Sequence, residues 1–275
     1  MRHLVFAGFC LSLTVLQACS PSVKTAKKPA VATVETLYRE GHAYYVDRNL
    51  DSAAAVLRRA VAADSGYVPA LTELADVQYE LAMRMSTEDD PARLSLFRSA
   101  RSCLVRLEAL GNGESGLYER ICELSVALSD NRSFLKYAKK NAEKFPFDRQ
   151  MYNLGLAYYQ TADYPSAVRV LREASEKFKS SSYIGGFYRT LGLAYMRQDR
   201  DQTATRTLET GLQAVDKKLA EVRPAGQNPS SPEIRTLSDD RIAILMTLRK
   251  LFTTYKEQQK LERIERLLRD AGQIK

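Results

Sequence analysis

The fold is decided by residues 151–174, which read MYNLGLAYYQTADYPSAVRVLREA. Apolar residues recur every three or four positions on both sides of the short polar stretch 161–163, a spacing typical of two amphipathic helices. Gly155 in the first helix and Ala167 in the second lie twelve positions apart. Small residues let two backbones approach closely where the helices cross. The stretch therefore predicts a helical hairpin.

The same hairpin pattern occurs twice more in the chain. Gly41 and Ala53 are twelve positions apart, and so are Gly192 and Ala204. Large residues stand at matching positions in the three copies: Leu37, Tyr44, Tyr45 and Leu57; Met151, Tyr158, Tyr159 and Leu171; Tyr188, Tyr195, Met196 and Leu208. A pattern repeated at fixed spacing predicts stacked units, each of which buries its apolar face against its neighbours.

Weaker copies occupy the sequence between the strong ones. A period of about 34 residues leads from Gly41 to Ala75, and the same period counted back from Gly155 reaches Ile121, in a degenerate unit over 114–147. The second helix of the Ala75 unit is displaced by the segment 85–91, whose composition is typical of a loop followed by a helix start. Residues 180–182 are predicted to be a three-residue insertion.

The pattern resembles the tetratricopeptide repeat, in which two antiparallel helices need a small residue at their crossing and another early in the second helix. This resemblance implies an all-α fold, a right-handed solenoid of about six tetratricopeptide-like helix hairpins. It assigns about five units to residues 34–218, a linker to 219–244 and the last unit to 245–275. That last unit is either a degenerate repeat, since terminal units of solenoids are often atypical, or one capping helix.

Residues 1–18 have the layout of a secretory signal, with a basic start followed by an uncharged stretch over 4–16. The run LQAC at 16–19 resembles the lipobox of bacterial lipoproteins, which implies lipidation of Cys19 with a fatty acid such as palmitate. An ordinary signal peptide that ends by chance at a cysteine is the alternative. Residues 19–33 lack helical periodicity, so we expect a flexible tether.

The lipoprotein resemblance also implies a location. Ser20 follows the cysteine, and in Gram-negative lipoproteins a residue other than Asp at that place implies export to the outer membrane. We therefore expect a bacterial outer-membrane lipoprotein that faces the periplasm, with the inner membrane or secretion as alternatives. Without residues 1–18 the chain keeps 40 of its 41 Lys and Arg and all 33 Asp and Glu, a net charge of about +7. Export argues against nucleic acid as the partner of this surplus, which leaves an anionic surface, an acidic protein face or no electrostatic partner.

In the tetratricopeptide family the first helices of successive units line a concave groove. The resemblance places these side chains on its wall: Tyr38, His42, Tyr45, Asp76, Tyr79, Tyr118, Tyr152, Tyr159, Arg189, Met196 and Arg197. Tyrosine offers a large rigid contact area with a polar tip at small entropic cost, which predicts a groove that binds a protein or peptide. The alternative is packing, since tyrosine is common in the repeat and Tyr44, Tyr158 and Tyr195 fall at packing positions.

The sequence offers no catalytic, cofactor or metal site. Gly111–Gly116 matches the dinucleotide fingerprint GxGxxG, but a helix and not a strand precedes it, which predicts a turn between units. His42 is the only histidine after the signal, so no His-based metal site is expected. We predict that the protein is not an enzyme and uses no cofactor. Cys103 and Cys122 are predicted to be buried thiols, able to form a disulfide only if they face each other.

Together these observations predict a lipid-anchored scaffold or adaptor that holds a protein partner near a membrane during envelope assembly or secretion. Two alternatives stay open: a ligand-handling accessory of a solute transporter, and a regulator of a cell-wall hydrolase that docks through the loop at 85–91. Residues 241–275 carry nine basic and four acidic side chains, so the C-terminal end is a candidate for contact with an anionic surface.

Overall fold

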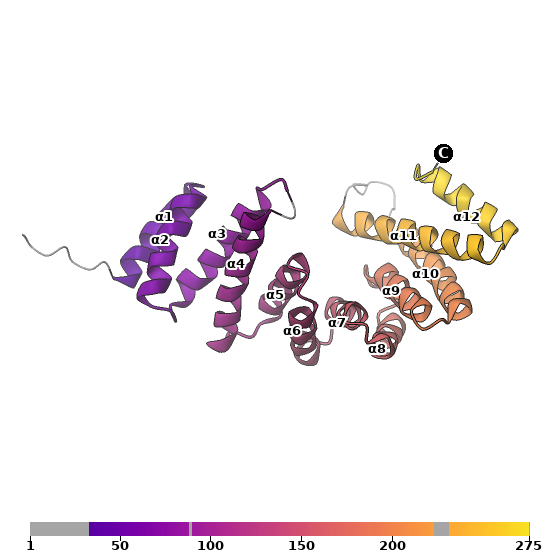
Figure 1. Ribbon diagram of the computed structural model, residues 1–275, viewed down its shortest axis with the longest axis horizontal. Coiled ribbons are helices and arrows are strands. Elements are labelled where there is room, and N and C mark those ends of the chain that lie inside the picture. Colours follow the sequence, from indigo (N-terminus) through magenta and orange to yellow (C-terminus); the bar gives the residue numbers. More distant parts are fainter. Residues whose placement is uncertain (1–32, 88–89, 223–230, 275) are drawn as a thin grey trace, which may run out of the picture. The chain divides into compact units, whose positions relative to one another are not determined.

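The computed structural model describes residues 33–87, 90–222 and 231–274. These residues form twelve helices and no strand, which confirms the predicted all-α fold. The helices are α1 (Val34–Val46), α2 (Leu50–Ala63), α3 (Val68–Met83), α4 (Pro91–Ala109), α5 (Ser115–Ala127), α6 (Asn131–Lys144), α7 (Asp148–Gln160), α8 (Tyr164–Lys177), α9 (Ile184–Met196), α10 (Asp201–Val222), α11 (Pro232–Thr254) and α12 (Gln258–Asp270). They pack as six consecutive hairpins (Figure 1). We call the first helix of each hairpin its A helix and the second its B helix.

The glycines that defined the pattern lie where the A and B helices of a hairpin touch. A Cβ atom on Gly155 would lie 2.4 Å from Cγ of Leu171, and the equivalent distances are 2.7 Å for Gly41 and Leu57 and 2.6 Å for Gly192 and Leu208. All three leucines are fully buried. A side chain at the glycine position would therefore push against a leucine that has no free space to enter, so the spacing of small and large residues sets how closely the two helices pack.

Five of the six hairpins in the described residues turn from A helix to B helix in the same way. Each turn contains one residue with positive φ, between 53° and 61°: Arg48, Ser129, Ala162, Asp199 and Lys256. The residue after it donates its backbone N–H to a carbonyl five positions earlier, at 2.8–3.0 Å, which is the Schellman pattern that ends a helix. The sixth hairpin, α3 and α4, has the predicted inserted loop instead, and residues 88–89 of that loop lie outside the described part.

Several B helices begin with a side-chain cap directly after this turn. The side-chain oxygens of Asn49, Asp130 and Asp163 accept hydrogen bonds from the backbone N–H groups three residues later, at 3.0–3.3 Å. These caps satisfy backbone donors that a helix start leaves unpaired. The turn and the cap together fix the direction in which the B helix leaves the A helix.

Neighbouring hairpins join because each B helix packs against the next A helix. The core is built from small and branched apolar side chains at these contacts. In the C-terminal part, one continuous buried cluster includes Leu171, Phe187, Leu208, Leu245 and Phe252. Each hairpin thus buries its apolar face against the next one, as the repeat predicts.

The C-terminal region differs from the predicted boundaries. The linker expected over 219–244 is largely helical, because α10 continues to Val222 and α11 begins at Pro232. Ile234 and Leu237 are buried, so the start of α11 belongs to the core. The last unit is a hairpin of α11 and α12 and not one long helix, and its turn at Lys256 matches the other turns. The predicted signal peptide and all of the predicted tether except Thr33, which caps α1, lie outside the described residues.

Candidate partner-binding face

The side chains predicted to line a groove lie on the A helices, and many of them contact the next A helix along the chain. Every one of the five junctions between successive A helices carries at least one side-chain hydrogen bond or ion pair. We call this series of contacts the A-helix ladder. It runs from α1 to α11 and gives the A-helix face a continuous set of polar and aromatic side chains.

At the first junction, two side chains of α1 bind carboxylates of α3. Nδ1 of His42 lies 2.9 Å from Oε2 of Glu73, and the Tyr45 hydroxyl donates to Oε1 of Glu80 at 2.8 Å. Tyr38 packs edge-on against Tyr67. Burial is the main cause that raises the pKa of Tyr38, and the charge of Glu73 is the second. The hydrogen bond to Glu80 is the main cause that raises the pKa of Tyr45. Both tyrosines therefore stay protonated at neutral pH and act as donors.

The second junction is a single ion pair between Asp76 of α3 and Arg120 of α5. Both side chains are partly exposed, so solvent reaches the pair. A small cavity of about 310 Å³ lies beside it, lined by Val68, Leu104 and Leu117 together with Arg120.

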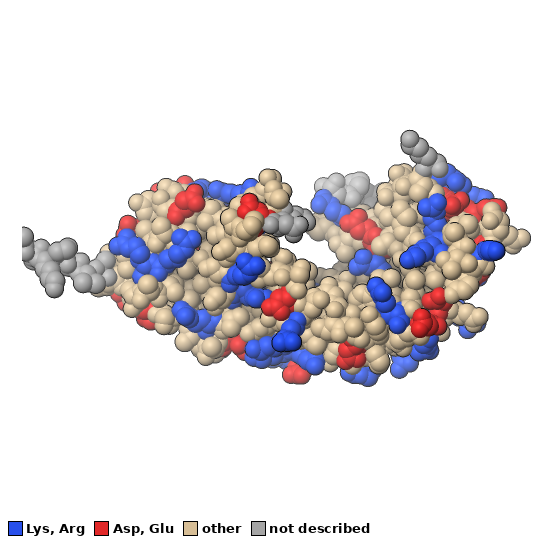
Figure 2. Space-filling model, viewed as in Figure 1, with Lys and Arg blue, Asp and Glu red and all other residues tan. Residues whose placement is uncertain are grey.

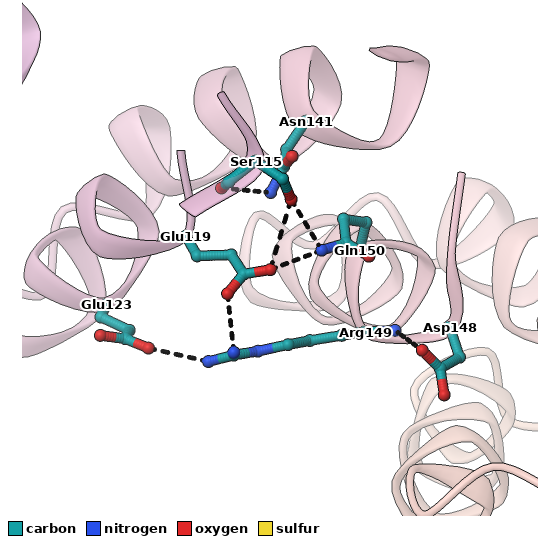
Figure 3. Close-up of polar contacts among 7 residues, drawn as sticks. All are labelled: Ser115, Glu119, Glu123, Asn141, Asp148, Arg149 and Gln150. Carbon is teal, nitrogen blue, oxygen red and sulfur yellow. Dashed lines mark hydrogen bonds and ion pairs between the residues drawn. The ribbon is translucent and has the colours of Figure 1, made fainter. Parts of the chain in front are cut away.

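A branched polar network joins α5 to α7 at the third junction (Figure 3). Arg149 binds Glu119 at 2.6 Å and Glu123 at 2.9 Å, one carboxylate to each end of its guanidinium group. Next to it, the buried amide of Gln150 donates to the other oxygen of Glu119 at 2.5 Å and to the Ser115 hydroxyl at 3.0 Å. One arginine and one glutamine thus fix the same carboxylate from two sides, which holds its orientation.

The last two junctions share Arg189 of α9. Its Nη2 donates to the Tyr152 hydroxyl of α7 at 3.2 Å, and its Nε lies 3.2 Å from Oδ1 of Asp240 in α11. Asp240 is only 7 % exposed, and burial raises its pKa while the charge of Arg189 lowers it. The ring of Tyr152 also stacks on Tyr183 at 5.5 Å. Arg189, predicted to lie on the groove wall, is therefore engaged in an ion pair with Asp240 of α11.

The other predicted wall residues fall into two groups. Tyr79 packs 5.9 Å from Phe97 of α4, and Tyr118 is 7 % exposed and packs against Tyr137 of α6. Tyr118 therefore belongs to the core of its hairpin and presents little surface to a partner. Tyr159, Met196 and Arg197 are at least partly exposed at the C-terminal ends of α7 and α9. Tyr159 raises the pKa of Arg197, so the two side chains lie together.

The ladder partners Glu73, Glu80, Arg120, Arg149 and Asp240 were not among the predicted residues. A signal for some of them exists in the sequence, because His42–Glu73, Tyr45–Glu80 and Tyr152–Arg189 are 31, 35 and 37 positions apart, close to one repeat. A search for complementary side chains one repeat apart would find these pairs. Asp76 and Arg120 are 44 positions apart because the loop between α3 and α4 lengthens the spacing.

Cys103 and Cys122 are both buried and not bonded to each other, which confirms the prediction of buried thiols. Burial is the main cause that raises the pKa of Cys122 to about 12, so this side chain is an uncharged thiol at neutral pH.

In the described residues, no group of three His, Cys, Asp or Glu side chains is placed to hold a metal ion. The first four residues of the Gly111–Gly116 stretch lie in the predicted turn between α4 and α5, and Ser115 and Gly116 begin α5.

No protein-family model matches the chain, and no curated protein matches its sequence. Solved structures share its architecture. The crystal structure of MamA protein is 15 % identical, covers 71 % of this chain and 98 % of its own, and superimposes with a TM-score of 0.53. The structure of YrrB, described as a TPR protein with an unusual peptide-binding site, is 12 % identical, covers 76 % of this chain and 93 % of its own, and gives a TM-score of 0.52. The chain therefore has the tetratricopeptide-repeat fold, with consecutive helical hairpins forming a solenoid.

Proposed function

We propose that this protein is a non-enzymatic scaffold that binds a protein or peptide partner across its A-helix face. It is anchored by a lipid at Cys19 and serves envelope assembly or secretion at the outer membrane. The observation that carries the binding role is the A-helix ladder. It displays tyrosines and charged groups from successive A helices in orientations fixed by hydrogen bonds, so a partner meets a surface that is already ordered.

The chemistry of this face suits an extended polypeptide. His42 and Tyr45 on α1, Tyr159 on α7 and Arg197 at the end of α9 offer donors, acceptors and aromatic rings, so one extended segment can contact several of them in turn. The peptide-binding site named for YrrB, a protein with the same architecture, agrees with such a role. Tyrosine loses little side-chain entropy on binding, which makes each of these contacts efficient.

Lipid anchoring rests on sequence. The stretch LQAC at 16–19 supports it. No described helix is long and apolar enough to cross a membrane. The anchor is tested by replacing Cys19 with Ala in cells supplied with labelled palmitate. We expect the label and the membrane association to disappear together. Label that persists in the Cys19→Ala variant would show that the acylated residue is another one.

Site-specific photo-cross-linking tests the A-helix face. A photoreactive residue at His42 or Arg197 reports on that face, and one at Arg58 or Arg169, which are exposed on the B helices α2 and α8, is the matched control. We expect the same partner to be trapped from both A-helix positions and from neither B-helix position. Trapping only from Thr87, in the loop between α3 and α4, would favour the regulator that docks through its loop.

Substitutions provide the second arm of this test. Replacing Tyr45 and Tyr159 with Ala removes two aromatic contacts from separate A helices, and we expect at least a ten-fold loss of partner affinity with the helical circular dichroism unchanged. Replacing Arg58 and Arg169 with Ala is the control and should leave affinity unchanged. Equal affinity in both double variants would exclude the A-helix face as the binding surface.

A further inference from the structure

Charge is unequally divided between the A and B helices of the first four hairpins. The A helices α1, α3, α5 and α7 carry three basic and eight acidic side chains. The B helices α2, α4, α6 and α8 carry fourteen basic and five acidic side chains. The positive charge of this part of the molecule is thus concentrated on the B helices, away from the A-helix ladder.

The densest part of this charge is one stripe on α6. Arg132, Lys136, Lys140 and Lys144 follow one another at intervals of four, so they lie along one side of the helix, and the only acidic residue of α6 is Glu143. Like charges four positions apart destabilise a helix. The stripe therefore has an electrostatic cost for α6, and Figure 2 shows basic side chains gathered over this helix.

Half of the stripe is free to meet a partner. Lys140 is bound to Glu108 at 2.5 Å, and Lys144 donates to the carbonyl of Gly113. Arg132 and Lys136 are exposed and form no ion pair with any described residue. By contrast, several basic groups at the C-terminal end are neutralised, namely Arg241 by Asp216, Arg249 by Glu265 and Lys260 by Glu257. Arg263 and Arg266 of α12 are also exposed and form no ion pair with a described residue, but they alternate with Glu262 and Glu265, whereas α6 has a single acidic residue. The C-terminal end is therefore less uniformly basic than α6.

Two exposed apolar side chains lie in the loops at the end of the stripe. Phe147, between α6 and α7, is 62 % exposed, and Leu110, between α4 and α5, is 47 % exposed. The hydrogen bond from Lys144, the last residue of α6, to the Gly113 carbonyl joins the end of α6 to the loop between α4 and α5. Arg132 and Lys136 lie about two to three turns of α6 before these loops, so a flat anionic surface along the helix can meet both the charges and the apolar residues. Exposed apolar residues combined with basic groups bind the interface of an anionic bilayer.

We propose that α6, with Phe147 and Leu110 at its C-terminal end, docks on an anionic phospholipid surface. Arg132 and Lys136 contact lipid phosphates, and Phe147 and Leu110 enter the interfacial layer. An acidic protein would satisfy the basic groups, but the apolar side chains favour a bilayer because they are exposed beside the helix ends and need an apolar medium. This docking is independent of the acyl group at Cys19 and uses a surface other than the A-helix face.

The chain contains no tryptophan, so a single Trp introduced at Phe147 is a unique fluorescent probe. The full chain with Cys19→Ser, which cannot be acylated there, is mixed with phosphatidylcholine vesicles with or without phosphatidylglycerol. With Phe147→Trp we expect a blue shift and quenching by brominated lipid only when phosphatidylglycerol is present. Tyr255→Trp, at another exposed aromatic position, is the control and should show neither. No shift at position 147, or the same shift with neutral vesicles, would overturn the proposal.

A pair of charge variants tests the stripe itself. Arg132→Gln with Lys136→Gln removes the two free charges, and we expect vesicle binding to fall roughly five-fold for each charge removed. Arg263→Gln with Arg266→Gln removes two exposed charges from α12 and should leave binding unchanged. A loss in the α12 variant with none in the α6 variant would assign the contact to the C-terminal end. Binding of polyglutamate without binding of anionic vesicles would assign it to an acidic polypeptide, and either result overturns the proposal.

Discussion

At the scale of single residues, Gly155 and Leu171 show how little space separates the helices of a hairpin. A methyl group on Gly155 would overlap the buried Leu171 side chain. Gly116, near the start of α5, has no atom within 4 Å of the equivalent position and so provides a matched comparison. The same substitution therefore has opposite expected effects at two glycines of one protein.

We expect Gly155→Ala to lower the free energy of unfolding by about 1–3 kcal/mol, because overpacking outweighs the better helix propensity of alanine. Gly116→Ala should be neutral or stabilising by up to about 1 kcal/mol. Urea unfolding followed by circular dichroism measures both. A double-mutant cycle with Leu171→Ala should show that the two positions interact, and simple additivity would contradict the contact.

The buried pair of Arg189 and Asp240 gives a second prediction at this scale. Arg189→Met leaves Asp240 buried without its partner, and we expect a loss of about 3 kcal/mol, the lower end of the usual range because Arg189 is a third exposed. Adding Asp240→Asn should restore most of this loss. If the double variant is as unstable as Arg189→Met alone, the pair is not what holds α9 to α11.

The pH dependence of this variant follows from the same pKa. Burial raises the pKa of Asp240 above its ordinary value of 3.8. The stability that comes from the raised pKa is therefore fully present below pH 3.8, where the carboxyl is uncharged, and is lost as pH rises through the folded-state pKa. Without Arg189 the carboxyl is harder to ionise. The destabilisation by Arg189→Met should therefore be larger near pH 7 than near about pH 4, measured by thermal unfolding at both.

Among these residues, the small-to-large spacing of Gly155 and Leu171 was visible in the sequence because local periodicity reports helix packing. The ion pair of Arg189 and Asp240 was not, since its partners are separated by the lengthened α10 and α11. Tyr118 was placed on the groove wall from its register alone. Its burial against Tyr137 depends on how the degenerate third hairpin packs, which register does not show.

At the scale of elements, the turn between the A and B helices is the most regular feature. The residue with positive φ is Arg48, Ser129, Ala162, Asp199 or Lys256, five different residue types in one backbone conformation. The helix starts after these turns could be predicted from cap residues such as Asp163. The left-handed residue could not, because its identity varies and the conformation is imposed by the packing of the two helices.

Ala162→Gly should stabilise the protein by about 0.5–1 kcal/mol, since glycine adopts positive φ without the cost that alanine pays. Ala157→Gly, in the buried interior of α7, should instead destabilise by about 1 kcal/mol or more. Thermal unfolding of the two variants checks the sign of each effect. A loss of stability in both would mean that the turn at Ala162 carries no backbone strain.

At the scale of the whole molecule, the hairpins contact only their neighbours, so stability depends on each junction in turn. The third junction relies on a polar network around Arg149 and Gln150. Cooperative unfolding of the hairpins on either side of the third junction therefore depends on side chains, such as Arg149, that are partly exposed to solvent. The number of hairpins was predictable from the repeat, but the chemistry of each junction was not, since each uses different residue types.

We expect Arg149→Gln to weaken the third junction by about 1 kcal/mol. The dependence of the unfolding free energy on urea concentration should also become less steep, because the hairpins before and after this junction begin to unfold separately. Arg172→Gln, exposed on α8 and in no ion pair with a described residue, is the control and should leave the slope unchanged. Hydrogen exchange should show earlier opening in α5 and α7 of the first variant. An unchanged slope and exchange pattern would mean that apolar packing alone couples these hairpins.

The A-helix ladder also has a mechanical consequence. Its hydrogen bonds and ion pairs resist the separation of successive A helices. Dissolved ions screen partly exposed charges more strongly than buried ones. The ion pair of Asp76 and Arg120 therefore weakens as ionic strength rises, whereas the ion pair at the buried Asp240 changes less. Salt therefore lowers the resistance to separation unequally, more at the junction of α3 and α5 than at the junction of α9 and α11.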